Sequence, residues 1–450
     1  MKVIIIGGGE VGFHVAKALS EEDYDITVID IDPFKCRRAS ENLDVIVVEG
    51  NGASPKTLTE AFVGEADYVL CLTRVDEVNL IASQQAHKLG ANKIIARLRN
   101  QQYTAKDSII RPEKFGVDVV IHPEKAACEE IIRLVKHPYA VQAMDFEAGR
   151  LTMLGIHING ECENIKGKHL GDVCLENSHF RFGTIAVLRG QETIVPWSDF
   201  QFQDGDIAYF IIKTEDVQNL LRLLCKKATK THRVMIIGGS KIGRSLAQEL
   251  PSETVNVRLV EYNRPKAGRI SHNIDHSMIL FGDGTDLEFL KSENIQDVDS
   301  FISVTENEKT NLIAGLLAKH LGVKQSIIHV STTEYIPTIQ EIGAGAVISK
   351  NLSTVNSILR ELYTDVTEIP VLTFDEIDVD VIEFQPEPNS PVTQRPLKEL
   401  NFPQDSIVGM INHHGKIRIA HGTSILTEDD TALVFAKPKA INKLKKLFGS

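Results

Sequence analysis

The sequence predicts an α/β protein in which two doubly wound parallel-sheet domains stand in tandem, each followed by a small α+β subdomain. Three observations predict this fold. A β-branched run leads through glycines into an amphipathic helix, strand and helix patterns alternate behind it, and the whole series recurs in the second half of the chain. At 450 residues the chain is long enough for several domains, each with its own core.

The first element is the run from Val3 to Ile6, whose four β-branched residues are typical of a buried parallel strand. Glycines follow with the G-x-G-x-x-G spacing, just ahead of an amphipathic helix. The first glycine permits a tight turn, the second lets backbone amides approach a pyrophosphate, and the third lets helix and strand pack closely. The residues that we expect to hold phosphate are Gly7, Gly8, Gly9, Glu10, Val11 and Gly12.

The second strand, expected over residues 26–29, ends in Asp30. Its separation from Gly12 suits an acid that accepts hydrogen bonds from a ribose diol, and its charge would repel a 2′-phosphate, which disfavours NADP. A glycine motif alone is weak, and the alternative is a plain strand-to-helix turn beside a solvated acid. Strand, turn, helix and acid together favour a Rossmann-like nucleotide site.

Further strands and helices continue the alternation, and ligands of such sheets bind outside the C-terminal strand ends. The residues that we place on this rim, in addition to Asp30, are Asn51, Gly52, Thr73 and Arg97. The expected strands are 44–48, 66–72, 93–98 and 117–121, and the expected helices are 58–62 and 79–89.

A different pattern begins after a helix that we expect over residues 124–135. Short alternating strands separated by glycine and aspartate turns predict a small α+β subdomain, and a polar basic run at 226–232 is the best candidate linker. The strands expected in it are 151–158, 185–188, 193–195 and 207–212, with a closing helix at 220–224.

The series then repeats at a nearly fixed offset, starting with Val234 to Gly243. The second candidate site comprises Gly238, Ser240, Lys241, Ile242, Gly243 and Glu261. The boundaries that we predict are 1–123 and 229–348 for the Rossmann-like domains, 124–146 and 349–372 for the crossover helices, and 147–228 and 373–450 for the small subdomains.

The second copy differs from the first at positions that a ligand would contact. Ser240 replaces the central glycine, and His329 replaces Arg97. A side chain at position 240 stands where backbone should meet a pyrophosphate, whereas Glu261 preserves the ribose acceptor. Whether this second site binds a ligand at all stays open from the sequence.

Composition excludes several classes of protein. A net charge of −12 argues against a general nucleic-acid binder, because that role needs a basic surface. The N-terminal run from Met1 to Ile6 is too short for a signal peptide. No apolar run approaches the roughly 20 residues of a spanning helix, so we expect a soluble, cytoplasmic protein. Six cysteines without a C-x-x-C pair and fifteen histidines without ligand spacing give no support for a metal site.

With these motifs in place, the chain resembles the TrkA family, the cytosolic nucleotide-binding subunits of Trk potassium uptake systems, built from two RCK (KTN) modules. The resemblance covers nearly the whole chain and rests on the glycine turns, Gly50-Asn51-Gly52, Thr73, Asn79 and Arg97. It implies a non-catalytic, peripheral subunit that senses NAD(H) or ATP/ADP at the inner face of the cell membrane. It also implies a homo-oligomeric ring, expected as a tetramer, beneath a potassium-translocating TrkH- or TrkG-like subunit, with the helices 124–135 and 352–362 exchanged between neighbouring modules.

The rival function is an NAD-dependent dehydrogenase, because one fold hosts many activities. A dehydrogenase needs a proton donor or acceptor near the nicotinamide. His122, His157 and His169 are isolated in the sequence, and we assign no catalytic residue. Duplication and the lack of an acid–base constellation favour a ligand sensor.

Overall fold

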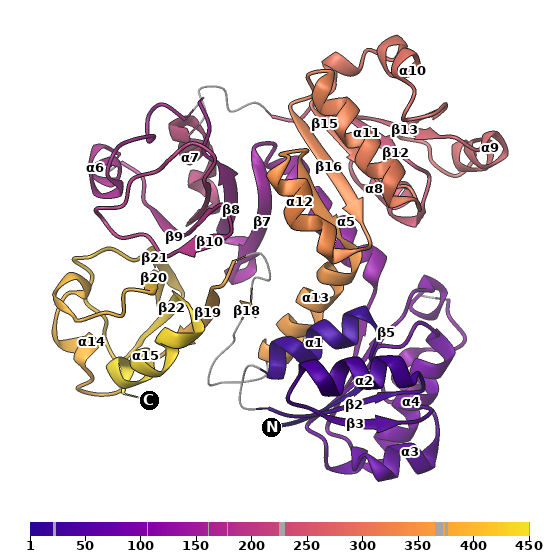
Figure 1. Cartoon of the computed structure of the whole chain (residues 1–450), viewed down its shortest axis with the longest axis horizontal. Coiled ribbons are helices and arrows are strands. Elements are labelled where there is room, and N and C mark those ends of the chain that lie inside the picture. The colour runs from indigo at the N-terminus through magenta and orange to yellow at the C-terminus, as the bar shows by residue number, and fades with distance from the viewer. Residues whose placement is uncertain are drawn as a thin grey trace. The chain divides into compact units, whose positions relative to one another are not determined.

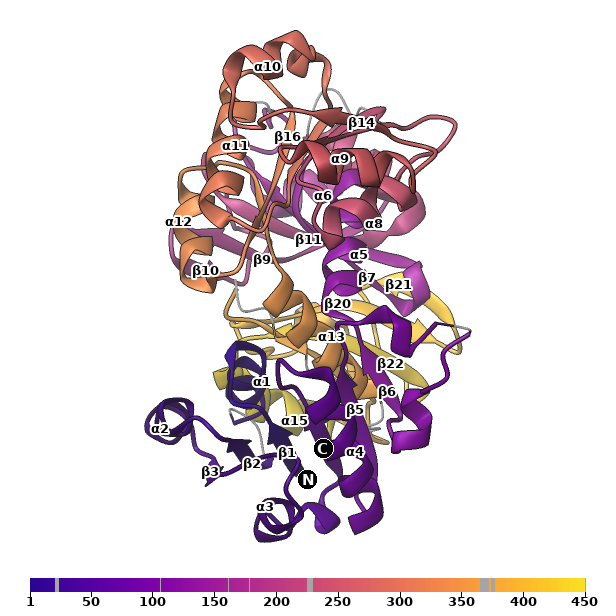
Figure 2. The same ribbon diagram turned by 90° about the vertical axis from the view of Figure 1, so that its right-hand side faces the viewer.

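The computed structural model describes residues 1–20, 24–105, 107–160, 162–177, 179–224, 230–364, 372–373 and 377–449. The chain divides into two compact units (Figures 1 and 2). One comprises Met1–Glu129 with Ile348–Leu362, and the other comprises Glu130–Val347 with Tyr363–Ser450.

The first unit contains a parallel sheet with the strand order β3-β2-β1-β4-β5-β6. The order reverses between β1 and β4, so the sheet is doubly wound, as the sequence predicts. Its strands are β1 (Lys2–Ile6), β2 (Asp25–Asp30), β3 (Ile46–Glu49), β4 (Tyr68–Cys71), β5 (Lys93–Arg97) and β6 (Val119–Ile121). Its helices are α1 (Glu10–Ser20), α2 (Pro33–Asn42), α3 (Pro55–Glu60), α4 (Asp76–Leu89) and α5 (Pro123–Lys136), of which α5 continues into the second unit.

One helix of this unit differs from its predicted range. We expected a short helix over 58–62, but α3 begins at Pro55, whose fixed φ suits the first helical turn. It ends at Glu60 because Phe62 adopts a left-handed conformation (φ 54°) that an α-helix cannot continue through.

The second unit contains a parallel sheet of the same order, β14-β13-β12-β15-β16-β17, which establishes the duplication in three dimensions. Its strands are β12 (Arg233–Ile237), β13 (Asn256–Glu261), β14 (Met278–Phe281), β15 (Ser300–Ser303), β16 (Gln325–Val330) and β17 (Ala346–Ser349). The helices around it are α8 (Lys241–Glu249), α9 (Arg264–Ser271), α10 (Leu287–Ser292), α11 (Glu308–His320) and α12 (Ile336–Glu341).

Two small sheets complete the second unit. The first has the order β10-β9-β11-β8-β7 and the second β18-β19-β22-β20-β21. The first comprises β7 (Ala140–Phe146), β8 (Leu151–His157), β9 (Phe182–Arg189), β10 (Glu192–Ile194) and β11 (Ile207–Lys213), with α6 (Leu170–Glu176) and α7 (Val217–Leu224). The second comprises β18 (Leu372–Thr373), β19 (Asp380–Phe384), β20 (Ser406–His413), β21 (Lys416–Ile419) and β22 (Asp430–Ala436), with α14 (Pro391–Gln394) and α15 (Ile441–Phe448).

The two small sheets share one hydrophobic core. Tyr209 and Ile211 of the first lie in the same buried cluster as Met410 and Phe435 of the second. Burial of this shared apolar surface stabilises the pair, at roughly 25 cal/mol per Å² removed from water. The two subdomains are therefore packed together rather than tethered.

Helices α5 and α13 (Lys350–Thr364) do not group only with the sheets whose last strands they follow. Residues Ile348–Leu362, which comprise the end of β17 and most of α13, group with the first sheet although β17 belongs to the second, and the views of Figures 1 and 2 agree on this. The second half of α5 groups with the second sheet, where the Gln325 side chain donates a hydrogen bond to the Leu134 carbonyl (2.9 Å).

The predicted crossover span 124–146 is not one helix. Helix α5 ends at Lys136, and residues Ala140–Phe146 form β7, an antiparallel partner of β8. The candidate linker 226–232 and the crossover span 349–372 lie partly outside the described residues. Among the described helices, none is long and apolar enough to cross a membrane.

Candidate functional site

The first glycine turn joins β1 to α1 with little room for side chains. Gly7 has a φ of +111°, and a Cβ atom there would lie 2.9 Å from the backbone nitrogen of Thr73. A Cβ on Gly12 would collide with the Gly7 carbonyl, so helix and strand approach as closely as the spacing predicts. The side chain of Val11, in the first turn of α1, is buried, so this residue can offer a ligand only its backbone.

Gly9 is the open position of this turn. A Cβ atom added to it would meet nothing within 4 Å, and its carbonyl accepts the first hydrogen bond of α1 from Phe13 (2.8 Å). The space beside the N-terminus of an 11-residue helix is where a phosphate is stabilised by backbone N–H groups and by the helix dipole. The neighbouring Glu10 carboxylate is paired with Arg38 (2.6 Å).

Asp30 lies at the end of β2 with only 8% of its surface exposed. Its Oδ2 accepts a hydrogen bond from the Gly8 N–H (2.7 Å), and its Oδ1 accepts one from the Asp32 N–H (2.9 Å). Lys35 Nζ stands 3.5 Å from Oδ1. A carboxylate has about four lone-pair sites, so capacity remains for ribose hydroxyls.

The rim beyond Asp30 is fixed by a second set of contacts. Asn51 is exposed, and its Oδ1 accepts a hydrogen bond from the Ala53 N–H (2.9 Å). Gly52 lies against Ile6, where a Cβ atom would collide with the isoleucine side chain. The turn after β3 therefore closes over the end of β1.

A buried amide holds the strand ends of β4 and β5 together. Asn79, fully buried on α4, accepts hydrogen bonds at Oδ1 from the Thr73 N–H (2.9 Å) and hydroxyl (2.6 Å). Its Nδ2 donates to the carbonyls of Thr73 (3.1 Å) and Arg97 (2.7 Å). Both amide atoms are thus used in positioning two predicted rim residues.

Arg97 lies in a group of charges that we call the Arg97 cluster, formed by Arg97, Arg99, Glu124 and Lys350. Glu124, 7% exposed, stands 3.7 Å from Arg99 Nε and 3.5 Å from Lys350 Nζ of α13. Arg97 is 7% exposed, and its Nε atom has no hydrogen-bond partner among the described residues. Burial and the neighbouring Arg99 lower the pKa of Arg97, against the opposing effect of Glu124.

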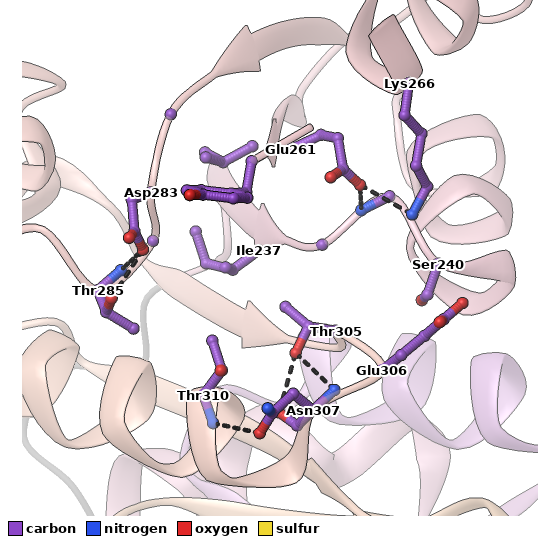
Figure 3. Close-up of a pocket in the computed structure, with 16 residues that line it drawn as sticks. Ile237, Ser240, Glu261, Lys266, Asp283, Thr285, Thr305, Glu306, Asn307 and Thr310 are labelled. Atoms are coloured by element: carbon purple, nitrogen blue, oxygen red, sulfur yellow. Dashed lines mark hydrogen bonds and ion pairs between the residues drawn. The ribbon is translucent and has the colours of Figure 1, made fainter. Parts of the chain in front are cut away.

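The second glycine turn opens on a cavity of about 380 Å³ (Figure 3). Gly238 repeats the positive φ of Gly7 (+105°), and Gly243 repeats the close approach of Gly12. The cavity lies outside the C-terminal ends of β12, β13 and β15, where a doubly wound sheet binds its ligands. Its polar lining residues are Ser240, Glu261, Tyr262, Lys266, Asp283, Thr285, Thr305, Glu306, Asn307 and Thr310.

Ser240 is the N-cap of α8, because its side-chain oxygen accepts a hydrogen bond from the Gly243 N–H (3.2 Å). The Ser240 side chain therefore lies at the helix N-terminus, and its effect on a pyrophosphate stays a prediction. Of the other predicted residues here, Ile242 is buried, and Lys241 does not line the cavity.

Glu261 occupies the place of Asp30 at the end of β13. It accepts hydrogen bonds from the Gly239 N–H (3.0 Å) and the Asn263 N–H (2.8 Å), and Lys266 Nζ lies 3.0 Å from its Oε2. Burial raises the pKa of Glu261, but these hydrogen bonds and the Lys266 charge outweigh it and hold the pKa below its usual value. The residue is therefore held as a carboxylate.

Three features of these sites escaped sequence reasoning. The lysines Lys35 and Lys266 stand at equivalent places beside the two acids, and Arg74 on the first rim is matched by Glu306 on the second. Alignment of the two halves at the repeat offset, extended beyond the motif residues, would have identified both pairs. No sequence pattern near Lys350 or Glu124 predicts that these two residues lie close together.

Two of the three candidate histidines hydrogen-bond to backbone carbonyls of the described residues. His122 Nδ1 is 2.7 Å from the Leu98 carbonyl, and His169 Nδ1 is 2.8 Å from the Asp199 carbonyl. Burial, assisted by Lys319, lowers the pKa of His157. None of the three lines the cavity of the second module.

Comparison with protein families matches both parallel-sheet modules. The TrkA-N domain model matches residues 3–123 and 234–350, and the TrkA-C domain model matches residues 381–449. The matched regions contain both glycine turns and both acids.

Curated relatives match the chain end to end. A protein of Methanosarcina mazei named Trk system potassium uptake protein TrkA homolog 1 is 32% identical over 457 residues, covering the whole of both chains. The Archaeoglobus fulgidus protein of the corresponding name is 31% identical over 448 residues, again covering both chains. The Halomonas elongata protein, Trk system potassium uptake protein TrkA, is 29% identical and 98% covered.

Solved structures share the fold at low sequence identity. The structure described as the GsuK channel bound to NAD superposes with a TM-score of 0.58 at 16% identity, covering all of this chain and 79% of the other. The structure described as the GsuK RCK domain has a TM-score of 0.58 at 16% identity, with 95% of the other chain covered.

Proposed function

The chain belongs to the TrkA family, and from that membership we propose that it is a peripheral, nucleotide-sensing regulatory subunit that gates a membrane potassium uptake system. The relatives that match it end to end are named as potassium uptake proteins. The alternative of a dehydrogenase is not favoured, because these names describe transport and two of the candidate histidines, His122 and His169, are engaged in hydrogen bonds with backbone carbonyls.

The observation that carries the proposal is the pairing of an open helix N-terminus at Gly9 with the buried acceptor Asp30. The first provides N–H groups for phosphate, and the second provides a carboxylate for a ribose diol. These are the two binding functions that an adenosine phosphate needs.

For the ligand, we propose NAD(H) at the first module, with ATP or ADP as the competitor. The GsuK channel, which shares this fold, was solved with NAD. Asn79 holds the Arg97 carbonyl on the same rim as Thr73, and we expect the arginines of the Arg97 cluster to favour a second phosphate or nucleotide half. Ligand size beyond adenosine diphosphate should therefore increase affinity.

The proposed assembly is a homo-oligomeric ring, expected as a tetramer, at the cytoplasmic face of a TrkH- or TrkG-like membrane subunit. We propose α5 and α13 as the crossover helices that link neighbouring modules. The grouping of Ile348–Leu362 with the first sheet supports this, as does the hydrogen bond of Gln325 to the second half of α5.

Gating would follow from differential affinity. A nucleotide that binds one shape of the ring more tightly than another shifts the equilibrium by that difference and no more. Coupling of about 1 to 3 kcal/mol per site, added over several modules, suffices to move a gate.

The decisive experiment is to co-purify the chain with its membrane subunit, reconstitute both in vesicles, and record potassium flux with and without NADH, NAD, ATP and ADP. We expect flux to depend on the presence of the chain and on nucleotide, and this dependence to be lost in the Asp30→Ala variant. Flux that ignores nucleotide and the chain, or steady nicotinamide turnover with a small-molecule substrate, would overturn the proposal.

A further inference from the structure

The cavity of the second module keeps the frame of the first site but reverses its charge. Each replacement removes a feature that suits phosphate or adds one that opposes it. Three exchanges fall in the cavity lining and are, from the first module to the second, Gly9 to Ser240, Asn51 to Asp283 and Arg74 to Glu306; a fourth, Arg97 to His329, lies in β16 outside the lining.

The helix N-terminus of this cavity is already capped. The Ser240 hydroxyl accepts the Gly243 N–H that a phosphate would otherwise accept, and it fills the place that Gly9 leaves open. Glu306 lies on the same side of the cavity as Ser240 in Figure 3. A phosphate bound there would lack the Gly243 N–H as a donor and would be repelled by the Glu306 carboxylate.

The rest of the lining adds to this opposition. The Asp283 carboxylate is fixed by hydrogen bonds from the Thr285 N–H (2.8 Å) and hydroxyl (2.7 Å). Among the described residues that line the cavity, three are carboxylates and one is a cation, Lys266, which is paired with Glu261. Uncompensated like charges in a confined site select against anionic ligands.

Groups that suit the remainder of a nucleotide are retained. Glu261 stays ionised, and its oxygens keep lone-pair sites for ribose hydroxyls. Tyr262, 73% exposed, lines the cavity next to it and presents an aromatic ring to a planar base. A volume of about 380 Å³ lies at the small end of ligand pockets, roughly 300 to 1,000 Å³.

We propose that the second cavity binds a ribonucleoside without phosphate groups, represented by adenosine, and excludes nucleoside diphosphates and dinucleotides. The inference rests on the proposed function in one respect, namely that the first module is the nucleotide site. Each chain would then bind two different adenosine-containing ligands, one in each module. Charge exchanges that run the other way, such as Glu10 to Lys241 and Asp32 to Asn263, fall on residues that do not line the cavity.

The test is calorimetric titration of the full chain with adenosine, ADP and NAD, in the absence and presence of magnesium. In the Asp30→Ala background, where the first site is weakened, we expect the tightest adenosine binding to have one site per chain, and ADP to bind the second cavity at least tenfold more weakly than adenosine. Tyr262→Ala and Glu261→Gln should each weaken adenosine at least fivefold. Tyr262 is exposed, so its replacement leaves the fold intact.

Charge reversal sharpens the test. Adding Ser240→Gly and Glu306→Arg to the Asp30→Ala background imports the charge pattern of the first module, and ADP affinity should rise at least tenfold. The matched control is Glu253→Arg, the same change of charge at an exposed glutamate that does not line the cavity, and it should leave ADP affinity unchanged.

Four results would overturn the inference: two equal ADP or NAD sites per wild-type chain, ADP that binds the second cavity only with magnesium, adenosine binding that is absent, or adenosine binding that ignores Tyr262 and Glu261. Failure of the proposed function is distinguishable, because it would appear as NAD and ADP binding that is indifferent to Asp30→Ala.

Discussion

The two parallel-sheet modules share a frame and differ in what a ligand would touch. In the first, Asn79 holds Thr73 and the Arg97 carbonyl through four hydrogen bonds of 2.6 to 3.1 Å. In the second, Asn311 holds Thr305 and the His329 carbonyl through four of 2.6 to 3.1 Å. The side chains facing the ligand space have changed, so the buried network must serve the fold rather than one ligand.

The largest expected effect tests this shared frame. Asn79→Ala and Asn311→Ala each leave buried backbone groups without partners, and each should destabilise its own module by about 2 to 4 kcal/mol. Hydrogen exchange of the amides in β4 and β15 measures the two modules separately. The exposed Gln84→Ala on the same helix as Asn79 is the control. A loss of protection in only one of the two variants would contradict the equivalence of the networks.

The next effect separates the two acids. Asp30→Ala should weaken NAD or ADP binding by about 1 to 3 kcal/mol, since it removes charge-assisted hydrogen bonds to the ribose. Glu261→Ala should leave that binding unchanged, because it alters only the second module. Calorimetry on both variants decides. Unchanged affinity in Asp30→Ala would reduce the aspartate to a structural strand end that braces Gly8 and Asp32.

Much of this comparison was available in the sequence. The β-branched runs fix the strands because they are buried on both faces, and the glycine spacing fixes the turns because Gly7 and Gly12 have no room for Cβ atoms. Repetition at a fixed offset identified the second module, and Ser240 and His329 marked it as different.

What the sequence did not yield depends on contacts between distant residues. Lys350 stands beside Glu124 although the chain separates them by the whole second sheet, and no local pattern announces such a pair. The strand β7 was missed within an expected crossover because it begins at Ala140, only a few residues after α5 ends at Lys136. The change of charge from Arg74 to Glu306 was missed because both residues are exposed and take no part in a hydrophobic periodicity.

A smaller effect tests the helix N-termini. Gly9→Ser should fold normally, because the space around Gly9 is open, yet it should weaken nucleotide binding by about 1 kcal/mol through competition for the helix N–H groups. Gly9→Ala, which adds volume without a hydroxyl, is the matched control and should weaken it less. In the second module, Ser240→Ala should cost about 1 kcal/mol of stability through loss of the cap. Equal affinities for Gly9→Ser and wild type would remove the argument for competition.

The smallest effect is a pH dependence of the second module. Hydrogen bonds from Asn263 and Gly239 and the charge of Lys266 overcome burial and hold the pKa of Glu261 below its usual value. A carboxyl whose pKa is lower in the folded chain than in the unfolded one contributes stability above the unfolded pKa, about 4.3, and loses that contribution as pH falls through the folded pKa. Glu261→Gln keeps the size and an acceptor oxygen but cannot titrate. The variant should therefore be less stable than wild type near pH 6, and the difference should shrink steadily below about pH 4.3. Hydrogen exchange in β13 across this range, corrected for intrinsic exchange rates, measures the difference. A gap that stays constant or widens in acid would show that Glu261 braces the turn by shape alone, and that its ionisation adds nothing to the second module.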